Sequence, residues 1–284
     1  ISSAEIGQGL VTVLQMITAE ELKLPLEQVN VYLSDTDLTP DGGPTTGSRQ
    51  TYISGNAAKF AAIQLRNSML ATLSEKYNLP PDEIVLDQGV VQLNGKELTF
   101  AEIGSLMKAE GREPKLTYKY ESPETTPLGE SGDKHFAYSF AAQAMEVEVD
   151  LTTGEVRIVR AIGATDVGKA INPLGLQGQV EGGLIMGIGH ALTEEFILEE
   201  GQVFTDHLSR YRMPSIHHVP EEMQVIIVED PTADGPYGGK GVGEISTMPV
   251  PPAIINGVYN ACGVRLNRFP VDQDWLAREI AKTR

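Results

Sequence analysis

The stretch AMEVEVDLTTGEVRIVRAIGA, residues 144–164, holds the clearest fold signal in the sequence. Apolar and charged residues alternate from Met145 to Val149, and a second alternating run follows the turn-like residues 151–154. Such alternation places successive side chains on opposite faces of a strand. Two runs of this kind around a short turn predict a β-hairpin.

The sequence after this hairpin carries helical and strand patterns in turn. Asn172-Pro173 suits the cap and first turn of a helix, which we expect to continue through a glycine-rich run to about Glu195. A strand is predicted at residues 223–229. A glycine-rich loop then leads to a predicted helix from about Pro249 to Cys262, with Gly263 as its stop.

The first part of the chain shows the same mixture. Apolar spacing predicts helices over residues 10–22, 55–77 and 100–110, the last with capping-box spacing between Thr99 and Glu102. Short apolar runs predict strands at residues 29–33, 84–86 and 90–93. Turn residues, mainly Gly, Pro and Asp, separate these elements.

A polar stretch with two prolines and two glycines, residues 121–132, has the composition of a linker. We therefore predict two subdomains, residues 1–120 and residues 121–284, of which the second carries the glutamate loop described below. Because helices and hairpins mix without a repeating βαβ unit, we predict an α+β fold with two mixed helix/sheet subdomains rather than a doubly wound parallel sheet.

Composition narrows the class of protein. A length of 284 residues with 41% hydrophobic residues is ample for a core, and the net charge of -17 argues against a nucleic-acid-binding face. The single cysteine, Cys262, excludes a cysteine-ligated iron–sulfur cluster on this chain. His217 and His218 lack spaced partners, so no protein-ligated metal is predicted. No membrane span or signal peptide is evident, and we expect a cytoplasmic location.

Glycine clusters mark the candidate sites. Gly7-Gln8-Gly9 directly precedes a predicted helix, where backbone N–H groups can hold an anion such as a pyrophosphate. Residues 42–50 form a second such loop. Five glycines between Gly178 and Gly189 interrupt a helical pattern at about 0.8–1 kcal/mol each relative to Ala, which suggests close packing against a helix or a ligand. Taken singly, the two loops are also compatible with an ordinary turn and a surface loop.

The run Gly238-Gly239-Lys240-Gly241-Val242-Gly243-Glu244 superficially suggests a dinucleotide fingerprint, but its glycines are evenly spaced and no suitably placed acid follows. A carboxylate at the end of a loop without side chains can instead enter a pocket poor in water, where its basicity rises. A solvated loop glutamate is the alternative for this feature alone.

These features occur together, in one order, from about Ala4 to Pro270. The series resembles the second molybdopterin-binding region of the molybdenum hydroxylases, the family of xanthine dehydrogenase, aldehyde oxidoreductase, carbon monoxide dehydrogenase and the bacterial N-heterocycle hydroxylases. It consists of Gly7-Gln8-Gly9, Pro44-Thr-Thr-Gly-Ser48, Asp166-Val-Gly168 with Asn172-Pro173, Gly178-Gln179-Val-Glu-Gly-Gly183, and Lys240-Gly-Val-Gly-Glu244 with Pro249 and Asn256.

The resemblance implies a role for each matching residue. Glu244 corresponds to the catalytic glutamate of the family. The implied cofactor-binding residues are Gly7, Gln8, Gly9, Gly47, Ser48, Arg49, Gln50, Gln179 and Gly243. The match to the family is imperfect in these loops. Leu10 stands where several members carry His, and Arg49 and Gln50 vary within the family, so their individual contacts with the cofactor are less secure than that of Gln8. The cofactor is molybdenum-molybdopterin, and the sequence leaves open whether the pterin carries a cytosine dinucleotide.

The same resemblance implies half of a molybdenum-cofactor module, in an oligomeric enzyme that oxidises an electron-poor carbon of a purine, N-heterocycle or aldehyde with water as oxygen source. Iron–sulfur clusters and FAD are expected on other domains or subunits, and the N-terminal half of the molybdenum module is an expected partner. Since no initiator Met is present, we expect a piece of a longer enzyme, inactive alone. The alternatives are a noncatalytic assembly module and a nucleotide-dependent dehydrogenase, and the substrate cannot be read from the sequence.

Overall fold

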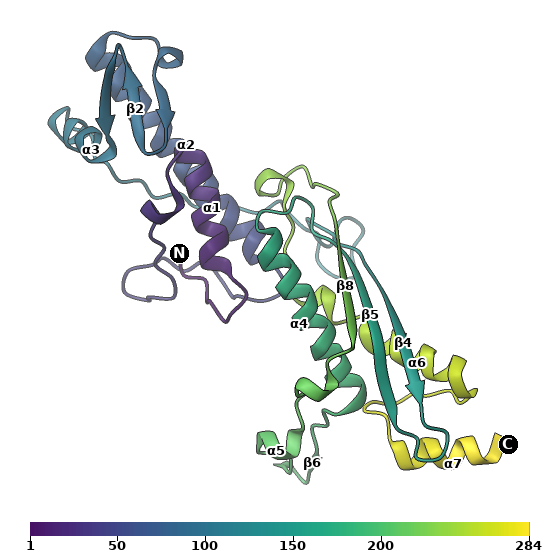
Figure 1. Cartoon of the computed structure of the whole chain (residues 1–284). Coiled ribbons are helices and arrows are strands. Elements are labelled where there is room, and N and C mark those ends of the chain that lie inside the picture. Colours follow the sequence, from purple (N-terminus) through teal and green to yellow (C-terminus); the bar gives the residue numbers. More distant parts are fainter. Residues whose placement is uncertain (284) are drawn as a thin grey trace. The chain divides into compact units, whose positions relative to one another are not determined.

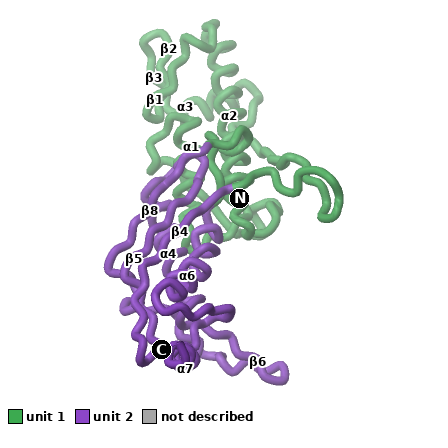
Figure 2. The backbone as a smooth tube through the Cα atoms, turned by 90° about the vertical axis from the view of Figure 1, so that its right-hand side faces the viewer, with its two compact units in different colours: residues 1–138, 231–241 green, residues 139–230, 242–284 purple. Residues whose placement is uncertain are grey.

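The computed structural model describes residues 1–283, which form two compact units (Figure 2). Unit 1 comprises Ile1–Tyr138 and Pro231–Gly241, and unit 2 comprises Ser139–Asp230 and Val242–Arg284. A segment from late in the sequence therefore belongs to the unit built from the early sequence. The predicted subdomain boundary at residue 121 remains a prediction; the chain passes from unit 1 to unit 2 after Tyr138.

Two packed helices form the centre of unit 1. The first, α1, runs from Leu10 to Leu22 as predicted, and a 3-10 turn, η1, follows at Leu26–Gln28. The second, α2, spans Gln50–Tyr77 and packs against α1. It begins at Gln50 rather than near Gly55, because the loop before it already turns helically at Arg49, whose carbonyl accepts the Ile53 N–H at 2.8 Å.

The strand predicted at residues 29–33 is wrong, since this segment pairs with no neighbouring strand. Alternating apolar residues indicate which side chains can face a core, but they supply no partner for the backbone. The Val29 carbonyl instead accepts a hydrogen bond from Gln15 Nε2, at 2.8 Å.

A small antiparallel sheet completes unit 1. Its strands are β1 Val85–Asp87, β2 Val90–Leu93 and β3 Lys96–Thr99, and the 3-10 turn η2 at Pro81–Glu83 precedes them. Helix α3, Phe100–Ala109, starts with the predicted capping box, in which Thr99 and Glu102 bond each other's backbone N–H. The buried cluster between this sheet, α3 and the end of α2 contains Met69, Leu73, Ile84, Val91, Leu93, Ile103 and Met107.

Unit 2 is built on the predicted hairpin. Strands β4, Ala141–Val149, and β5, Val156–Asp166, pair antiparallel, and β8, Glu222–Val228, pairs parallel with β5 (Figure 1). Helix α4, Pro173–Leu192, makes the crossover between β5 and β8. One βαβ connection thus exists that the sequence pattern did not indicate. A single crossover beside an antiparallel hairpin keeps the fold in the predicted α+β class.

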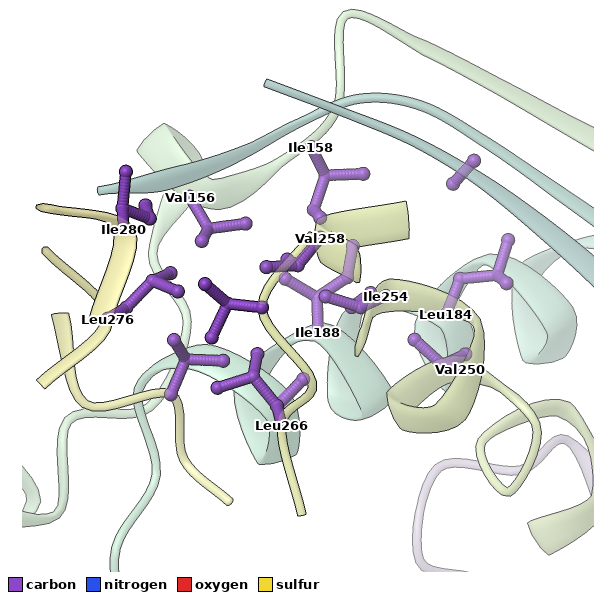
Figure 3. Close-up of a cluster of buried hydrophobic side chains, with 14 of the residues drawn as sticks. Val156, Ile158, Leu184, Ile188, Val250, Ile254, Val258, Leu266, Leu276 and Ile280 are labelled. Atoms are coloured by element: carbon purple, nitrogen blue, oxygen red, sulfur yellow. The ribbon is translucent and has the colours of Figure 1, made fainter. Parts of the chain in front are cut away.

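Helices α4, α6 (Val250–Cys262) and α7 (Gln273–Thr283) bury the main core of unit 2 with the sheet. Figure 3 shows Leu184 and Ile188 of α4 among Val250, Ile254 and Val258 of α6. The close approach relies on glycine: a Cβ at Gly187 would lie 2.3 Å from Val250 Cβ. The predicted close packing of the glycine-rich helix against another helix is therefore confirmed at this position.

An arm between α4 and β8 carries four short elements. These are β6 Leu198–Glu199, β7 Gln202–Val203, α5 Leu208–Tyr211 and the 3-10 turn η3 Ile216–His218. Two further 3-10 turns, η4 Pro236–Gly238 in unit 1 and η5 Glu244–Ser246 in unit 2, lie near the glutamate loop. Among residues 1–283, every helix is too short or too polar to span a bilayer.

Candidate functional site

Unit 1 brings two of the predicted cofactor loops together. The segment before α1 is tied to the loop before α2 by several hydrogen bonds: Ser3 Oγ donates to Gln50 Oε1 at 2.6 Å, and the Ala4 N–H donates to Thr45 Oγ1 at 2.8 Å. Ser3 is almost completely buried. The Gly7-Gln8-Gly9 turn and the loop at residues 47–50 therefore belong to one hydrogen-bonded assembly.

The Gly7-Gln8-Gly9 turn is open but already holds a carboxylate. Gly7 and Gly9 have φ of +104° and +81°, and a Cβ on either would meet no atom within 4 Å. Glu5 accepts the N–H groups of Gly7, Gly9 and Val11 at 2.9, 3.0 and 3.0 Å. Partial burial raises the pKa of the Glu5 carboxyl, but these backbone donors outweigh it and the net pKa is lowered.

This arrangement corrects one sequence-based expectation. We expected the N–H groups at the start of α1 to hold an anion such as a pyrophosphate, but Glu5 takes three of them. An external anion would have to displace an internal one of like charge. What the turn leaves for a ligand is the open space beside its two glycines and the side chain of Gln8.

Gln8 folds back onto the same turn. Its Oε1 accepts the Ile6 N–H at 2.7 Å and its Nε2 donates to the Ala4 carbonyl at 2.8 Å. An amide side chain has two N–H donors and two acceptor lone pairs. Gln8 therefore shapes the turn and keeps one donor and one lone pair for a ligand.

Gln50, in contrast, has no hydrogen-bonding position left for a ligand. Its Nε2 donates to Thr45 Oγ1 at 3.0 Å and to the Pro44 carbonyl at 3.2 Å, while its Oε1 accepts from Ser3 and Ser54. All four hydrogen-bonding positions of the amide are occupied, and only 8% of the residue is exposed. Gln50 is thus suited to fixing the loop rather than to touching a ligand.

The remaining residues of this loop expose its backbone. Arg49 Nη1 closes the loop by donating to the Gly42 and Pro44 carbonyls, both at 3.0 Å. Gly47 has a φ of +60° with nothing within 4 Å of an added Cβ, and Ser48 also has a positive φ of +52°. The left-handed backbone at two successive residues turns the chain sharply where the family cofactor loop is expected.

The loop also meets the glycine-rich stretch that leads to the glutamate. A Cβ on Gly241 would lie 1.4 Å from the Ser48 carbonyl oxygen, so the two backbones are in direct contact and only glycine fits. Unit 1 thus joins Ser48 with Lys240 and Gly241, two motifs that are almost 200 positions apart in the sequence.

Unit 2 joins Gln179 and Glu244. Glu244 begins the 3-10 turn η5, which packs against α4. Ser246 Oγ donates to the Gly243 carbonyl at 3.1 Å and lies 3.5 Å from the Gln179 carbonyl. A Cβ on Gly183 would lie 2.0 Å from Ser246 Oγ. Gly183 therefore allows α4 to support the turn that carries the predicted base.

Two buried polar atoms beside η5 were not anticipated. Gln143 donates through Nε2 to the Ser246 carbonyl, but its Oε1 has no partner, and neither does Thr165 Oγ1. Ala141 pairs with Thr165 and Gln143 with Gly163, so the two polar residues are diagonal neighbours of the β4–β5 pair. The sequence signal was Gln143 at an inward position of β4, where the other inward residues are apolar.

These observations test whether the residues fit the implied cofactor. In unit 1, open glycine turns and an amide with a spare donor at Gln8 suit a polar ligand. In unit 2, the buried Gln143 Oε1 beside Ser246 is an unsatisfied acceptor, which a polar partner would satisfy. Within residues 1–283 no cluster of three His, Cys, Asp or Glu side chains could hold a metal ion by itself. A cofactor that brings its own metal ligands would fit this donor set.

Comparison with known proteins agrees with a chain that binds such a cofactor. The molybdopterin cofactor-binding domain model matches residues 1–220. The chain is 34% identical over 287 residues to a probable xanthine dehydrogenase component of Bacillus subtilis, covering 97% of this chain and 36% of that protein. It is also 34% identical to the gamma component of the 6-hydroxypseudooxynicotine dehydrogenase complex of Paenarthrobacter nicotinovorans, with 96% and 34% covered.

Solved structures show the same fold. Quinoline 2-oxidoreductase from Pseudomonas putida 86 matches with a TM-score of 0.80 at 26% identity, over 98% of this chain and 36% of that one. The aldehyde oxidoreductase from Desulfovibrio desulfuricans matches with a TM-score of 0.76 at 30% identity, over 95% and 27%. The chain thus spans about a third of the length of the relatives it matches.

The predicted α+β class and the molybdopterin cofactor that the resemblance implied are confirmed by these matches. The chain belongs to the molybdopterin cofactor-binding domain family of the xanthine dehydrogenase and aldehyde oxidoreductase molybdenum-binding subunits.

Proposed function

We propose that this chain is the part of a molybdenum hydroxylase that carries the catalytic base, and that the complete enzyme oxidises an electron-poor carbon of a purine, an N-heterocycle or an aldehyde with water as oxygen source. The overall change, R–H + H2O to R–OH, releases two protons and two electrons. When bound, the molybdenum cofactor supplies the acceptor for those electrons, which pass on to iron–sulfur and flavin centres outside this chain.

The observation that carries the proposal is the support given to Glu244. The carboxylate stands at the start of η5, a turn held by Ser246 and by the close approach of Gly183 of α4. A base must be held in a fixed place to remove a proton during the attack of the oxygen on carbon. We assign that role to Glu244.

The other predicted residues take three roles in this proposal. Gln8 offers the cofactor its spare amide donor. Gly7, Gly9, Gly47 and Gly243 have no side chain and would let the cofactor approach the main chain closely, and Ser48 lies in the same left-handed turn as Gly47. Gln50 positions the loop that Arg49 closes. Gln179 of α4, whose carbonyl accepts from Ser246 Oγ of η5, would also hold the cofactor. A cytoplasmic location and partnership with the other half of the molybdenum module complete the proposal.

Replacing Glu244 with Gln in the complete enzyme tests the assignment. Gln keeps the size of the side chain but cannot accept the proton, so we expect the rate of enzyme reduction by substrate to fall by about 10²–10⁴-fold, with the molybdenum content unchanged. The measurement is rapid mixing of substrate with fully loaded enzyme. Glu229→Gln is a matched control, because that carboxylate is bound by Lys169 and by the Ala170 N–H. Reduction of the Glu244 variant within about threefold of the wild-type rate, well below the loss expected for a base, would contradict the role of Glu244.

A further inference from the structure

The 3-10 turn η5 is buried at one end and open at the other. Ser246, its last residue, is completely buried, whereas Glu244, its first, is exposed. A 3-10 helix rises about 2 Å per residue, so the two residues are only about 4 Å apart along the axis of the turn. The Glu244 carbonyl accepts the Thr247 N–H at 3.0 Å and the Met248 N–H at 3.3 Å, which closes the turn over Ser246. Contacts that fix Ser246 therefore also restrict Glu244.

Ser246 is held from two sides within unit 2. From α4, the Gln179 carbonyl accepts from Ser246 Oγ at 3.5 Å, and Gly183 lets the helix approach the turn. From β4, Gln143 Nε2 donates to the Ser246 carbonyl. A carbonyl oxygen only accepts, so the nitrogen of the amide must be the atom that faces it. The bond from α4 reaches the side chain of Ser246, and the bond from β4 holds the main chain of η5.

The pairing of β4 with β5 places Gln143 beside this turn. Gln143 is directly opposite Gly163, and residues directly opposite each other in an antiparallel pair share a face of the sheet. A Cβ on Gly163 would lie 3.2 Å from Val180 Cγ1 and 3.3 Å from Leu184 Cδ2, so this is the face that α4 covers. The close approach of α4 at Gly163 brings η5, which packs on α4, within reach of the Gln143 amide.

A polar side chain is unfavourable at this position of β4. The other inward residues of the strand are apolar, and Met145, Val147 and Val149 pack against the main core of unit 2. Among the described residues, the buried Gln143 Oε1 has no hydrogen-bond partner. A buried acceptor without a donor is destabilising, and an apolar residue of the same length would avoid that loss. An apolar residue would, however, leave the main chain of η5 without its bond to the sheet.

We propose that Gln143 is a positioning residue for Glu244 and acts through the Ser246 carbonyl. This inference rests on the proposed role of Glu244 as base, and every residue that it uses belongs to unit 2. The amide holds the buried end of η5 against β4 and thereby keeps the carboxylate at the exposed end in place. Misplacement of a catalytic group by about 1 Å can cost on the order of 10²-fold in rate, so a partial relaxation of η5 is enough to be measured.

The test is Gln143→Met in the complete enzyme. Met is unbranched like Gln and fills similar space, but it cannot donate to the Ser246 carbonyl. We expect faster hydrogen exchange at the Thr247 and Met248 amides, which are bonded to the Glu244 carbonyl. The limiting rate of reduction per bound molybdenum should fall about tenfold, with the molybdenum content and the half-saturating substrate concentration unchanged.

Two further variants separate the bond from a general effect of losing a glutamine. Gln15→Met is the matched control, because Gln15 Nε2 also donates to a main-chain carbonyl, that of Val29 in unit 1. It should change neither the rate nor the exchange in η5. Gln143→His keeps an N–H donor and should retain more of the rate than Gln143→Met; a rate equally low would show that the donor is not what matters. If Gln143→Met folds poorly, Gln143→Glu, which keeps the shape and removes the donor, takes its place.

A double variant separates this inference from the proposed function. If Gln143 acts through Glu244, adding Gln143→Met to Glu244→Gln should lower the rate no further. Losses that multiply in the double variant, or unchanged exchange at Thr247 and Met248 in Gln143→Met, would overturn the positioning role. Near wild-type reduction by Glu244→Gln alone would overturn the proposed function instead.

Discussion

Gly182 and Gly183 are adjacent on α4, yet an added methyl group has opposite consequences at the two positions. A Cβ at Gly182 would meet no atom within 4 Å. A Cβ at Gly183 would lie 2.0 Å from Ser246 Oγ, 2.6 Å from Ser246 Cβ and 3.1 Å from the Ser246 carbonyl carbon. Rotation of the serine hydroxyl cannot remove the last two contacts, so the turn η5 would have to move.

The magnitude follows from two effects. Replacing Gly by Ala inside a helix gains about 0.8–1 kcal/mol, and this gain applies equally to both positions. Overpacking typically costs about 1–3 kcal/mol, and it applies to Gly183 alone. We therefore expect Gly182→Ala to stabilise the protein by up to about 1 kcal/mol and Gly183→Ala to be less stable than Gly182→Ala by about 1–3 kcal/mol.

Thermal denaturation of the two variants side by side measures this difference, which corresponds to roughly 2–12 °C in the midpoint. Because η5 carries Glu244, Gly183→Ala should also slow reduction by substrate per bound molybdenum, whereas Gly182→Ala should not. Equal stabilities for the two variants, or a loss of rate in both, would refute the conclusion that Gly183 exists to let α4 support η5.

Two further predictions concern the turn before α1. Gln8→Ala should have a larger effect on the molybdenum content of the complete enzyme than on its melting temperature, because the amide offers a ligand contact besides its two backbone bonds. An unchanged molybdenum content would show that Gln8 has a purely structural role. Glu5→Gln should destabilise the protein at neutral pH. Since the folded pKa of Glu5 is lowered, its contribution is present above the ordinary value of 4.5 and is lost as the pH falls through the folded pKa. The stability difference from wild type should therefore shrink below about pH 4.5, and a difference that grows on acidification would show that the carboxylate does not hold the turn.

Local patterns in the sequence identified most of the regular elements. Helix α1, the hairpin of β4 and β5, and the capping box at Thr99 lie where the sequence predicts them, because each depends on residues within a few positions of one another. The strand predicted at residues 29–33 does not form, which shows what a local pattern cannot establish. Its alternation was real, but pairing depends on a second strand that the local pattern cannot reveal.

The candidate site shows the same limit at the level of single side chains. The sequence singled out Gln50 and the Gly7-Gln8-Gly9 turn as cofactor contacts, and neither the internal bonding of Gln50 nor the capture of the turn by Glu5 could be inferred from spacing. Glu5 has no distinguishing sequence context, since a carboxylate beside a glycine turn is common. Only the folded structure shows which donors a loop keeps for a ligand.

By itself the sequence determined the α+β class, the absence of a cysteine-ligated cluster and the family, because periodicity, composition and the order of short glycine motifs are all properties of the linear chain. Only the tertiary structure decided that Pro231–Gly241 belongs with α1 and α2, that Gly183 and Gly241 are glycines for want of space, and that Tyr237 is held by Glu21. These facts arise from contacts between residues about 60 to 220 positions apart, and such contacts exist only once the chain is folded.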